Sequence, residues 1–182
     1  LYGSDALGGI VVFTTKDASD YLLEGESFAA KVKAGYSDTG EQTNIGGTLA
    51  LQTGDFEHLL NLTHREGNEQ QNFHETKPTL DIESDSIMYK GKYNLNTTDF
   101  VSLTVDHWQQ DVAGNSAYGL LEYFRDLPGY DIVTERSKSE QDNNSVQLRY
   151  YSETATSIYD ILNVSIYSNR TKQKDVEYGL LD

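Results

Sequence analysis

Four histidines are the side chains in this sequence best suited to bind a metal or a cofactor. They are His58, His64, His74 and His107, and the chain of 182 residues contains no cysteine. Zinc sites draw their ligands from cysteine and histidine at short, regular spacings, and the intervals between these histidines match no such pattern. The sequence therefore predicts no metal site, and each histidine is interpreted first as an isolated surface or interface residue.

Carboxylates are more numerous, but their arrangement does not select a catalytic pair. Asp81, Glu83 and Asp85 alternate in a way that can ligate Ca²⁺, yet the segment lacks the glycine and the spaced glutamate of a calcium loop. It is interpreted as a solvated loop end. Glycoside chemistry needs two carboxylates that the fold holds together, and 29 acidic residues offer no way to choose them. No catalytic residue is predicted.

The charge of the chain and its longest apolar run restrict the class of protein. The net charge is −15, whereas nucleic-acid binding needs a basic surface, so no nucleic-acid partner is predicted. A transmembrane helix needs about 18 consecutive apolar residues, and the longest apolar run here is far shorter. A helical membrane protein is therefore excluded. A membrane β-barrel is not, because its strands show only alternation over about 10 residues.

Alternation of polar and apolar residues runs through most of the chain and predicts antiparallel strands. In residues 26–37, Phe28, Val32 and Tyr36 share one face, and Lys31 and Lys33 share the other. If this strand crosses a membrane, each lysine facing lipid would cost about 2–4 kcal/mol near the midplane, so the even-numbered positions face outward. Further strands are predicted at residues 43–52, 56–65, 87–95, 100–110, 146–151 and 158–170.

Connections of two lengths separate these strands. Those at residues 53–55, 96–99 and 152–157 are short, whereas those at residues 66–85 and 111–142 are long. Short and long connections alternate, with one early exception, the short connection at residues 38–42. Transmembrane barrels have this asymmetry, with short periplasmic turns and longer extracellular loops. The pattern predicts an all-β fold, an antiparallel transmembrane β-barrel, of which this chain supplies about seven strands.

The beginning of the chain contains its most specific motif. Gly3-Ser4-Asp5-Ala6-Leu7-Gly8-Gly9-Ile10-Val11 is followed by Thr15-Lys16-Asp17, and the β-branched run after the glycine pair indicates a short buried strand behind a tight corner. This string resembles the end of the plug domain of TonB-dependent outer-membrane receptors. The residues that follow it are more similar to the haem/haemoglobin and transferrin/lactoferrin receptor branch than to siderophore receptors.

This resemblance implies a domain organisation. Residues 1–16 would be the C-terminal end of the plug domain, and residues 17–25 would be a linker. Residues 26–182 would form the N-terminal part of a plugged barrel of 22 strands, so we expect the chain to be a piece of a longer protein. The residues that carry the plug-end motif are Gly3, Ser4, Asp5, Gly8 and Gly9.

The resemblance also implies a function. The whole protein would be a receptor and transporter in the outer membrane of a Gram-negative bacterium, importing haem or iron taken from host haem- or iron-binding proteins. Its partners would be haem or such a host protein, outer-membrane lipid, and TonB, which would contact a segment outside this chain. Binding and gating need no covalent step, so we expect no enzyme activity and no cofactor, with haem as a transported ligand. A siderophore receptor is the alternative within the family, and a structural or adhesive β-protein or a passive porin is the alternative of another class.

Two features of the long connections are candidate ligand contacts. His74 is the candidate haem ligand, because among the four histidines only His74 falls in a predicted extracellular loop. The segment 118–130 is rich in exposed apolar and aromatic residues of the kind that binding hot spots use, and the alternative is that it packs against the barrel mouth or neighbouring loops. Its candidate contact residues are Tyr118, Leu120, Leu121, Tyr123, Phe124, Arg125 and Tyr130.

Overall fold

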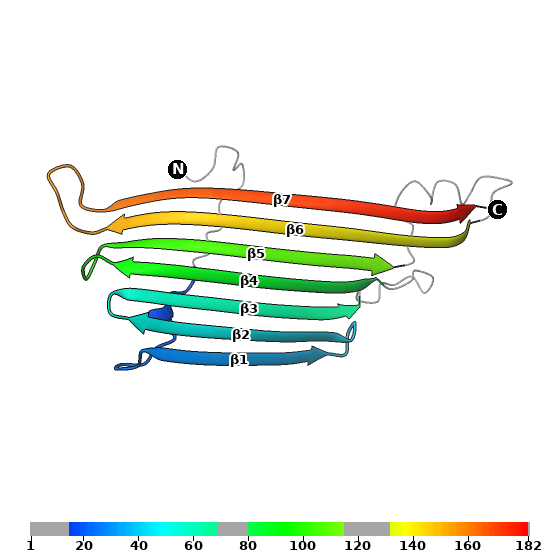
Figure 1. Ribbon diagram of the computed structural model, residues 1–182, viewed down its shortest axis with the longest axis horizontal. Coiled ribbons are helices and arrows are strands. Elements are labelled where there is room, and N and C mark those ends of the chain that lie inside the picture. The colour runs from blue at the N-terminus through cyan, green and yellow to red at the C-terminus, as the bar shows by residue number, and fades with distance from the viewer. Residues whose placement is uncertain (1–14, 69–79, 115–131, 182) are drawn as a thin grey trace.

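In the computed structural model, which describes residues 15–68, 80–114 and 132–181, seven strands form one antiparallel sheet in chain order (Figure 1). Among these residues the other regular element is η1, a 3-10 helix at Ala18–Asp20. The predicted all-β fold with about seven antiparallel strands is confirmed, and closure of the sheet into a barrel stays a prediction. The strands are β1 (Phe28–Ser37), β2 (Gln42–Thr53), β3 (Phe56–Asn68), β4 (Asp81–Asn94), β5 (Phe100–Gly114), β6 (Ile132–Ser152) and β7 (Leu162–Leu181).

The strands lengthen across the sheet. β1 has 10 residues, whereas β6 has 21 and β7 has 20. We call the end at which β2–β3, β4–β5 and β6–β7 are connected the turn end. Figure 1 shows that β6 and β7 project beyond β1–β3 at the opposite end. No helix in the described segments is long and apolar enough to cross a membrane.

The predicted strand boundaries agree with the structure at the short turn between β2 and β3. In the long connections they are wrong, because the strands extend into the predicted loops. Residues 66–68 belong to β3 and residues 81–85 to β4, although both were predicted to be loop. Likewise, residues 111–114 extend β5 and residues 132–142 begin β6. The predicted strand at 158–170 begins at Leu162 and continues through the predicted loop at 171–181.

These extensions escaped the sequence analysis because they are mostly polar and contain few apolar residues. In β6, Glu140 lies opposite Lys174 of β7, and Asp142 lies opposite Lys172. Cross-strand pairs of opposite charge stabilise a ladder without an apolar face. In β3–β7, apolar periodicity therefore marks only the part of the strand nearer the turn end.

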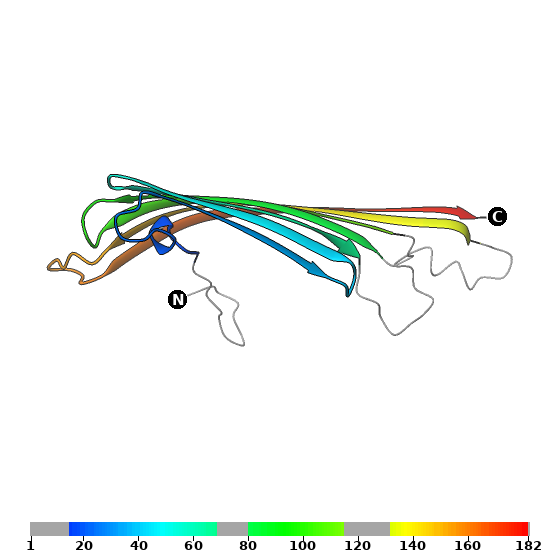
Figure 2. The same ribbon diagram turned by 90° about the horizontal axis from the view of Figure 1, so that it is seen from below.

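The sheet has two chemically different faces. Figure 2 shows that it is twisted and bowed, with η1 lying on one side, and we call that side the inner face. Lys31 and Lys33 share this face with Thr48 and Asn61, as their register requires. The opposite, outer face carries exposed apolar side chains on all seven strands, which we call the apolar band. Its members are Phe28, Val32, Ile45, Leu49, Leu51, Leu62, Ile87, Leu103, Val105, Val146, Leu148, Val164 and Ile166. The predicted alternation is confirmed.

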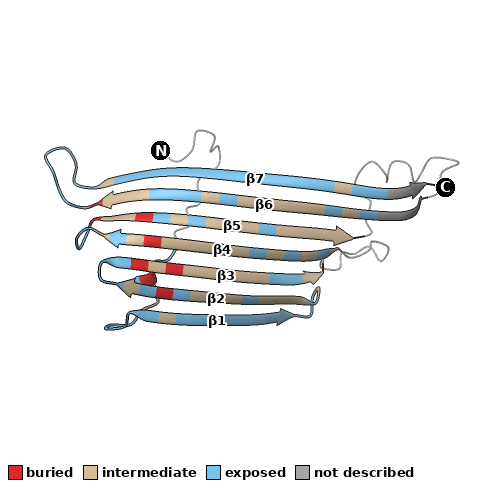
Figure 3. Ribbon diagram, in the orientation of Figure 1, coloured by how far each residue is buried: buried red, intermediate tan, exposed pale blue. Residues whose placement is uncertain are grey.

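Little of this apolar surface is buried within the chain. In the described part, the buried apolar residues are Ala18, Ala50 and Leu59. Figure 3 shows buried residues gathered at η1 and at the turn end of the strands beside it. Exposed apolar patches of this extent mark a surface that contacts protein or membrane, so the outer face needs an apolar neighbour.

Asp99 joins two connections at the turn end. Its carboxylate accepts hydrogen bonds from Thr154 Oγ1 at 2.7 Å and Asn96 Nδ2 at 2.9 Å, and from the backbone amide of Glu153 at 3.0 Å. Hydrogen bonds from Thr154 and Asn96 hold the pKa of this carboxyl below its usual range. The β4–β5 turn is thereby fastened to the residues that follow β6.

Candidate functional site

Asp17, the residue just before η1, ties the segment that precedes β1 to the inner face. Its carboxylate forms an ion pair with Lys90 and a second with Lys92, whose Nζ lies 3.0 Å from Oδ2. Lys90 also donates a hydrogen bond to the carbonyl oxygen of Thr15 at 3.1 Å. Lys90 and Lys92 are alternate residues of β4 and so point to the same side of the sheet. The strand therefore offers two ammonium groups to one carboxylate.

Glu57 of β3 completes this cluster from the neighbouring strand. It lies opposite Lys92 in the register, 3.3 Å from Nζ, and it is 4% exposed. Asn94 Nδ2 donates to Glu57 Oε1 at 2.9 Å, and the backbone amide of Ser19 in η1 donates to Oε2 at 3.1 Å. We call Asp17, Glu57, Lys90 and Lys92 the anchor network. Its two negative and two positive charges balance, which buried charges require.

Asp17 is ionised in this setting. Burial raises the pKa of its carboxyl, but hydrogen bonds and the positive charges of Lys90 and Lys92 outweigh that effect and lower it overall. The ion pairs are therefore formed at neutral pH. Their contribution to stability is complete above the pKa that Asp17 has in the unfolded chain. It is lost as pH falls through the lower pKa that Asp17 has in the folded protein.

Apolar contacts beside the network hold η1 against the sheet. Ala18 is 2% exposed and packs with Ala50 of β2 and Leu59 of β3. Partly buried side chains of the segment before β1 and of the sheet, including Tyr21 and Met88, surround this contact. A small side chain at position 18 lets the helix lie close to the strands. Ion pairs and packing thus act on the same short segment, and the arrangement can hold a chain segment in place.

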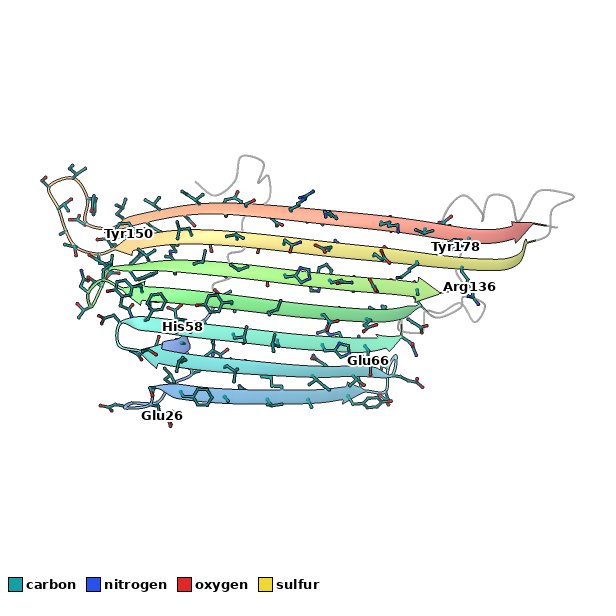
Figure 4. The ribbon with its side chains drawn as sticks, in the orientation of Figure 1. Glu26, His58, Glu66, Arg136, Tyr150 and Tyr178 are labelled. Carbon is teal, nitrogen blue, oxygen red and sulfur yellow. The ribbon has the colours of Figure 1, made fainter. Side chains whose placement is uncertain are left out.

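Aromatic side chains line the outer face near the turn end, and we call Phe56, His58, Tyr89, Tyr93 and Tyr150 the aromatic row. Phe56 stacks on His58 with ring centroids 4.8 Å apart, and it meets Tyr93 at 5.4 Å. His58 Nδ1 and the Tyr89 hydroxyl are hydrogen-bonded at 2.8 Å. Figure 4 places His58 and Tyr150 toward the turn end, and Glu66 and Arg136 toward the opposite end. Rings with a polar tip suit a boundary between an apolar layer and water.

A polar cluster lies on the outer face at the other edge of the apolar band. His64 of β3 and Asp85 of β4 are directly opposite each other, with Nδ1 2.8 Å from Oδ1. With Glu83 they place possible ligand atoms within 4.8 Å of one another. Sequence reasoning missed this juxtaposition because it assigned residue 85 to a solvated loop end, whereas Asp85 lies within β4. Only the strand register reveals the pair.

The site residues predicted from the sequence lie outside the residues that the structure describes. They are the plug-end motif Gly3, Ser4, Asp5, Gly8 and Gly9, the candidate haem ligand His74, and the candidate contacts Tyr118, Leu120, Leu121, Tyr123, Phe124, Arg125 and Tyr130. The structure describes the end of the opening motif, Thr15-Lys16-Asp17, and adds the partners of Asp17. Those partners lie more than seventy residues further along the chain, at Lys90 and Lys92. No local pattern connects them to Asp17.

Comparison with known proteins supplies relatives over most of the chain. No protein-family model matches. The chain is 26% identical to haemoglobin-binding protein A of Haemophilus influenzae, over 94% of this chain and 18% of that protein. This chain resembles haemoglobin- and haemin-binding proteins. It is also 29% identical to haemoglobin-haptoglobin-binding protein A of the same organism, over 92% of this chain and 17% of that protein.

A haemin receptor of Yersinia pestis is 26% identical over 82% of this chain and 21% of its own length. The predicted resemblance to haem and haemoglobin receptors is confirmed by these relatives, whose names denote binding proteins and receptors. The chain spans about a fifth of the length of the curated relatives it matches.

Proposed function

We propose that this chain is the part of a TonB-dependent outer-membrane receptor in which the plug ends and the barrel wall begins. The whole protein imports haem taken from host haem proteins such as haemoglobin. The observation that carries the proposal is similarity over 94% of the chain to a haemoglobin-binding protein. The two-faced antiparallel sheet, to which a preceding segment is bound, supports it.

The outer face supports contact with outer-membrane lipid. A transmembrane strand needs about 9–11 tilted residues, and β1 and β2 have 10 and 12. The apolar band crosses all seven strands, and the aromatic row borders it at the turn end. Barrels in membranes carry such an apolar belt between aromatic girdles. In the proposed receptor the turn end faces the periplasm.

The inner face supports a lumen that contains a plug. It is largely polar, and η1 and Asp17 are bound to it. A passive porin has no plug to connect to its wall, so a bound linker favours the receptor over that alternative. TonB would act on a segment outside this chain and supply the energy that moves the plug.

Growth on haemoglobin tests this function. Deleting the gene of the whole protein should abolish growth of its bacterium with haemoglobin as the sole iron source, and the intact gene should restore it. Growth on a simple iron salt should be unchanged, which controls for general damage. A deletion strain that still grows on haemoglobin but fails on a siderophore would reject haem import in favour of the siderophore alternative.

A fractionation experiment tests the location separately. The full-length protein should be recovered with the outer membrane and should stay there after washing with salt and alkali, because its outer face is embedded in lipid. Release by such washing would contradict a transmembrane barrel.

A further inference from the structure

We propose that the anchor network is a fixed pivot, and that the linker stays attached to β3 and β4 at Asp17 while the plug moves during transport. Plug movement is then confined to the chain before Thr15. This inference rests on the proposed function. It assigns Asp17 the role of a positioning residue, acting through the contact between linker and wall.

The first support is the path of the contact. The linker leads directly into β1, yet its ion pairs and hydrogen bonds reach past β1 and β2 to Lys90, Lys92 and Glu57. Asp17 and Lys92 are 75 residues apart in the chain. A pull on the preceding segment therefore acts on the middle of the described sheet and not on its first, edge strand.

The second support is that Lys92 and Glu57 have further partners within the sheet itself. Lys92 is held by Glu57 at 3.3 Å, and its Nζ lies 4.9 Å from the centroid of the Phe100 ring. Glu57 is held in turn by Asn94. Binding therefore costs little reordering of the receiving side chains, as in other preorganised sites.

The third support is the rigidity of the linker side. The backbone amide of Asp17 donates to Asp20 Oδ2 at 2.7 Å, which closes the turn of η1. Further along, the amide of Leu23 donates to Glu26 Oε2 at 3.1 Å, and the amide of Gln52 donates to the carbonyl oxygen of Ser27 at 2.8 Å. The segment from Asp17 to β1 is thus fastened at both ends. When the chain before Asp17 is displaced, that preceding chain bends and the fastened segment stays in place.

Hydrogen exchange of the purified full-length protein tests the anchor without relying on haem import. The amides of Asp17, Ser19 and Asp20 each donate a hydrogen bond and should be protected in the wild type, and Asp17→Asn should lose that protection. Glu24→Gln, an exposed carboxylate of the same linker, is the matched control and should leave it unchanged. Unprotected amides in the wild type would overturn the proposal whatever the protein transports.

Cross-linking tests whether the anchor stays closed during transport. Cysteines at positions 17 and 90 remove the ion pair between Asp17 and Lys90, and a short bifunctional thiol reagent restores the contact as a covalent link. The cross-linked protein should therefore bind haemoglobin and import haem at wild-type rates. The two single-cysteine variants treated with the same reagent are the controls. Retained binding with import lost only in the cross-linked protein would show that the linker must detach, and would overturn the pivot. Failure of the untreated wild type to import haem would instead reject the proposed function, and hydrogen exchange would still decide the anchor.

Discussion

The inner face of the strands carries paired charges, whereas the outer face of the same strands carries exposed apolar side chains. On the inner face, the side chain of Lys92 is 14% exposed and that of Glu57 is 5% exposed, and each charge has a partner of opposite sign. On the outer face, Leu103 lies opposite Gly91, the residue next to Lys92 in β4, and it is 40% exposed. Alternate residues of one strand thus satisfy charge on one side and leave apolar surface on the other. The sheet therefore has one polar face and one apolar face.

The largest effect should come from placing a charge on the wrong face. Val146→Lys puts an ammonium group into the apolar band of β6, and we expect a loss of about 2–4 kcal/mol in the free energy of unfolding, as for lysine at a bilayer midplane. Ser145→Lys is the matched control on the neighbouring residue. It faces inward and lies opposite Asp106. Urea unfolding of the full-length protein in lipid vesicles measures both, and equal losses would contradict the assignment of faces.

A smaller loss should follow from removing one charge of the anchor network. Lys92→Met leaves Glu57 and Asp17 with a missing partner, and breaking a buried pair costs about 3–5 kcal/mol when burial is complete. We expect Lys92→Met to lower the free energy of unfolding by about 2 kcal/mol, because Asp17 is partly exposed to water. Lys31→Met, an exposed lysine on the same face, is the control and should be close to neutral. Unfolding of both variants in the same vesicles makes the comparison.

Lowering the pH should release the linker while the apolar band is unaffected. The pKa of Asp17 is lowered in the folded protein, so its ion pairs are complete at pH 7 and weaken once pH falls below about 4, the value for an unperturbed aspartate. Fluorescence of a dye attached at position 16 of the full-length protein should change over that range. The change should be absent in Asp17→Asn. A transition near pH 6 in the wild type would point to a histidine instead.

The smallest effect should come from the aromatic row. Tyr89→Phe removes the hydrogen bond to His58 and should cost about 1 kcal/mol of stability, the usual net value of one hydrogen bond. Tyr36→Phe on β1, another exposed ring of the outer face, is the control. A cost in both variants, or in neither, would show that the bond between His58 and Tyr89 contributes nothing specific.

The sequence predicts those parts of the molecule in which a local pattern carries the information. Phe28, Val32, Lys31 and Lys33 assign the two faces of β1, because polar and apolar residues alternate there. The turn around Gly54 is equally clear, since its positive φ of 60° favours glycine.

The rest depends on pairing between distant segments. The polar halves of β6 and β7 have no apolar period and were predicted to be loops. Asp17 belongs to a recognisable string, but nothing near it indicates Lys90 or Lys92. His64 and Asp85 meet only because β3 and β4 continue past the apolar band. Local patterns in the sequence therefore predict the apolar part of the sheet. The side-chain clusters depend on strand pairing, which no local pattern indicates.

Spin labels along β6 of the full-length protein in lipid vesicles test the separation of the faces most directly. Labels at positions 145, 147 and 149 should collide mainly with a water-soluble nickel complex, because these residues face inward. Labels at positions 146, 148 and 150 should collide mainly with oxygen, which concentrates in lipid. An alternation of period two in the ratio of the two collision rates is the expected result. Equal access of the nickel complex to both sets would contradict a sheet with one face in the membrane and the other lining a polar interior.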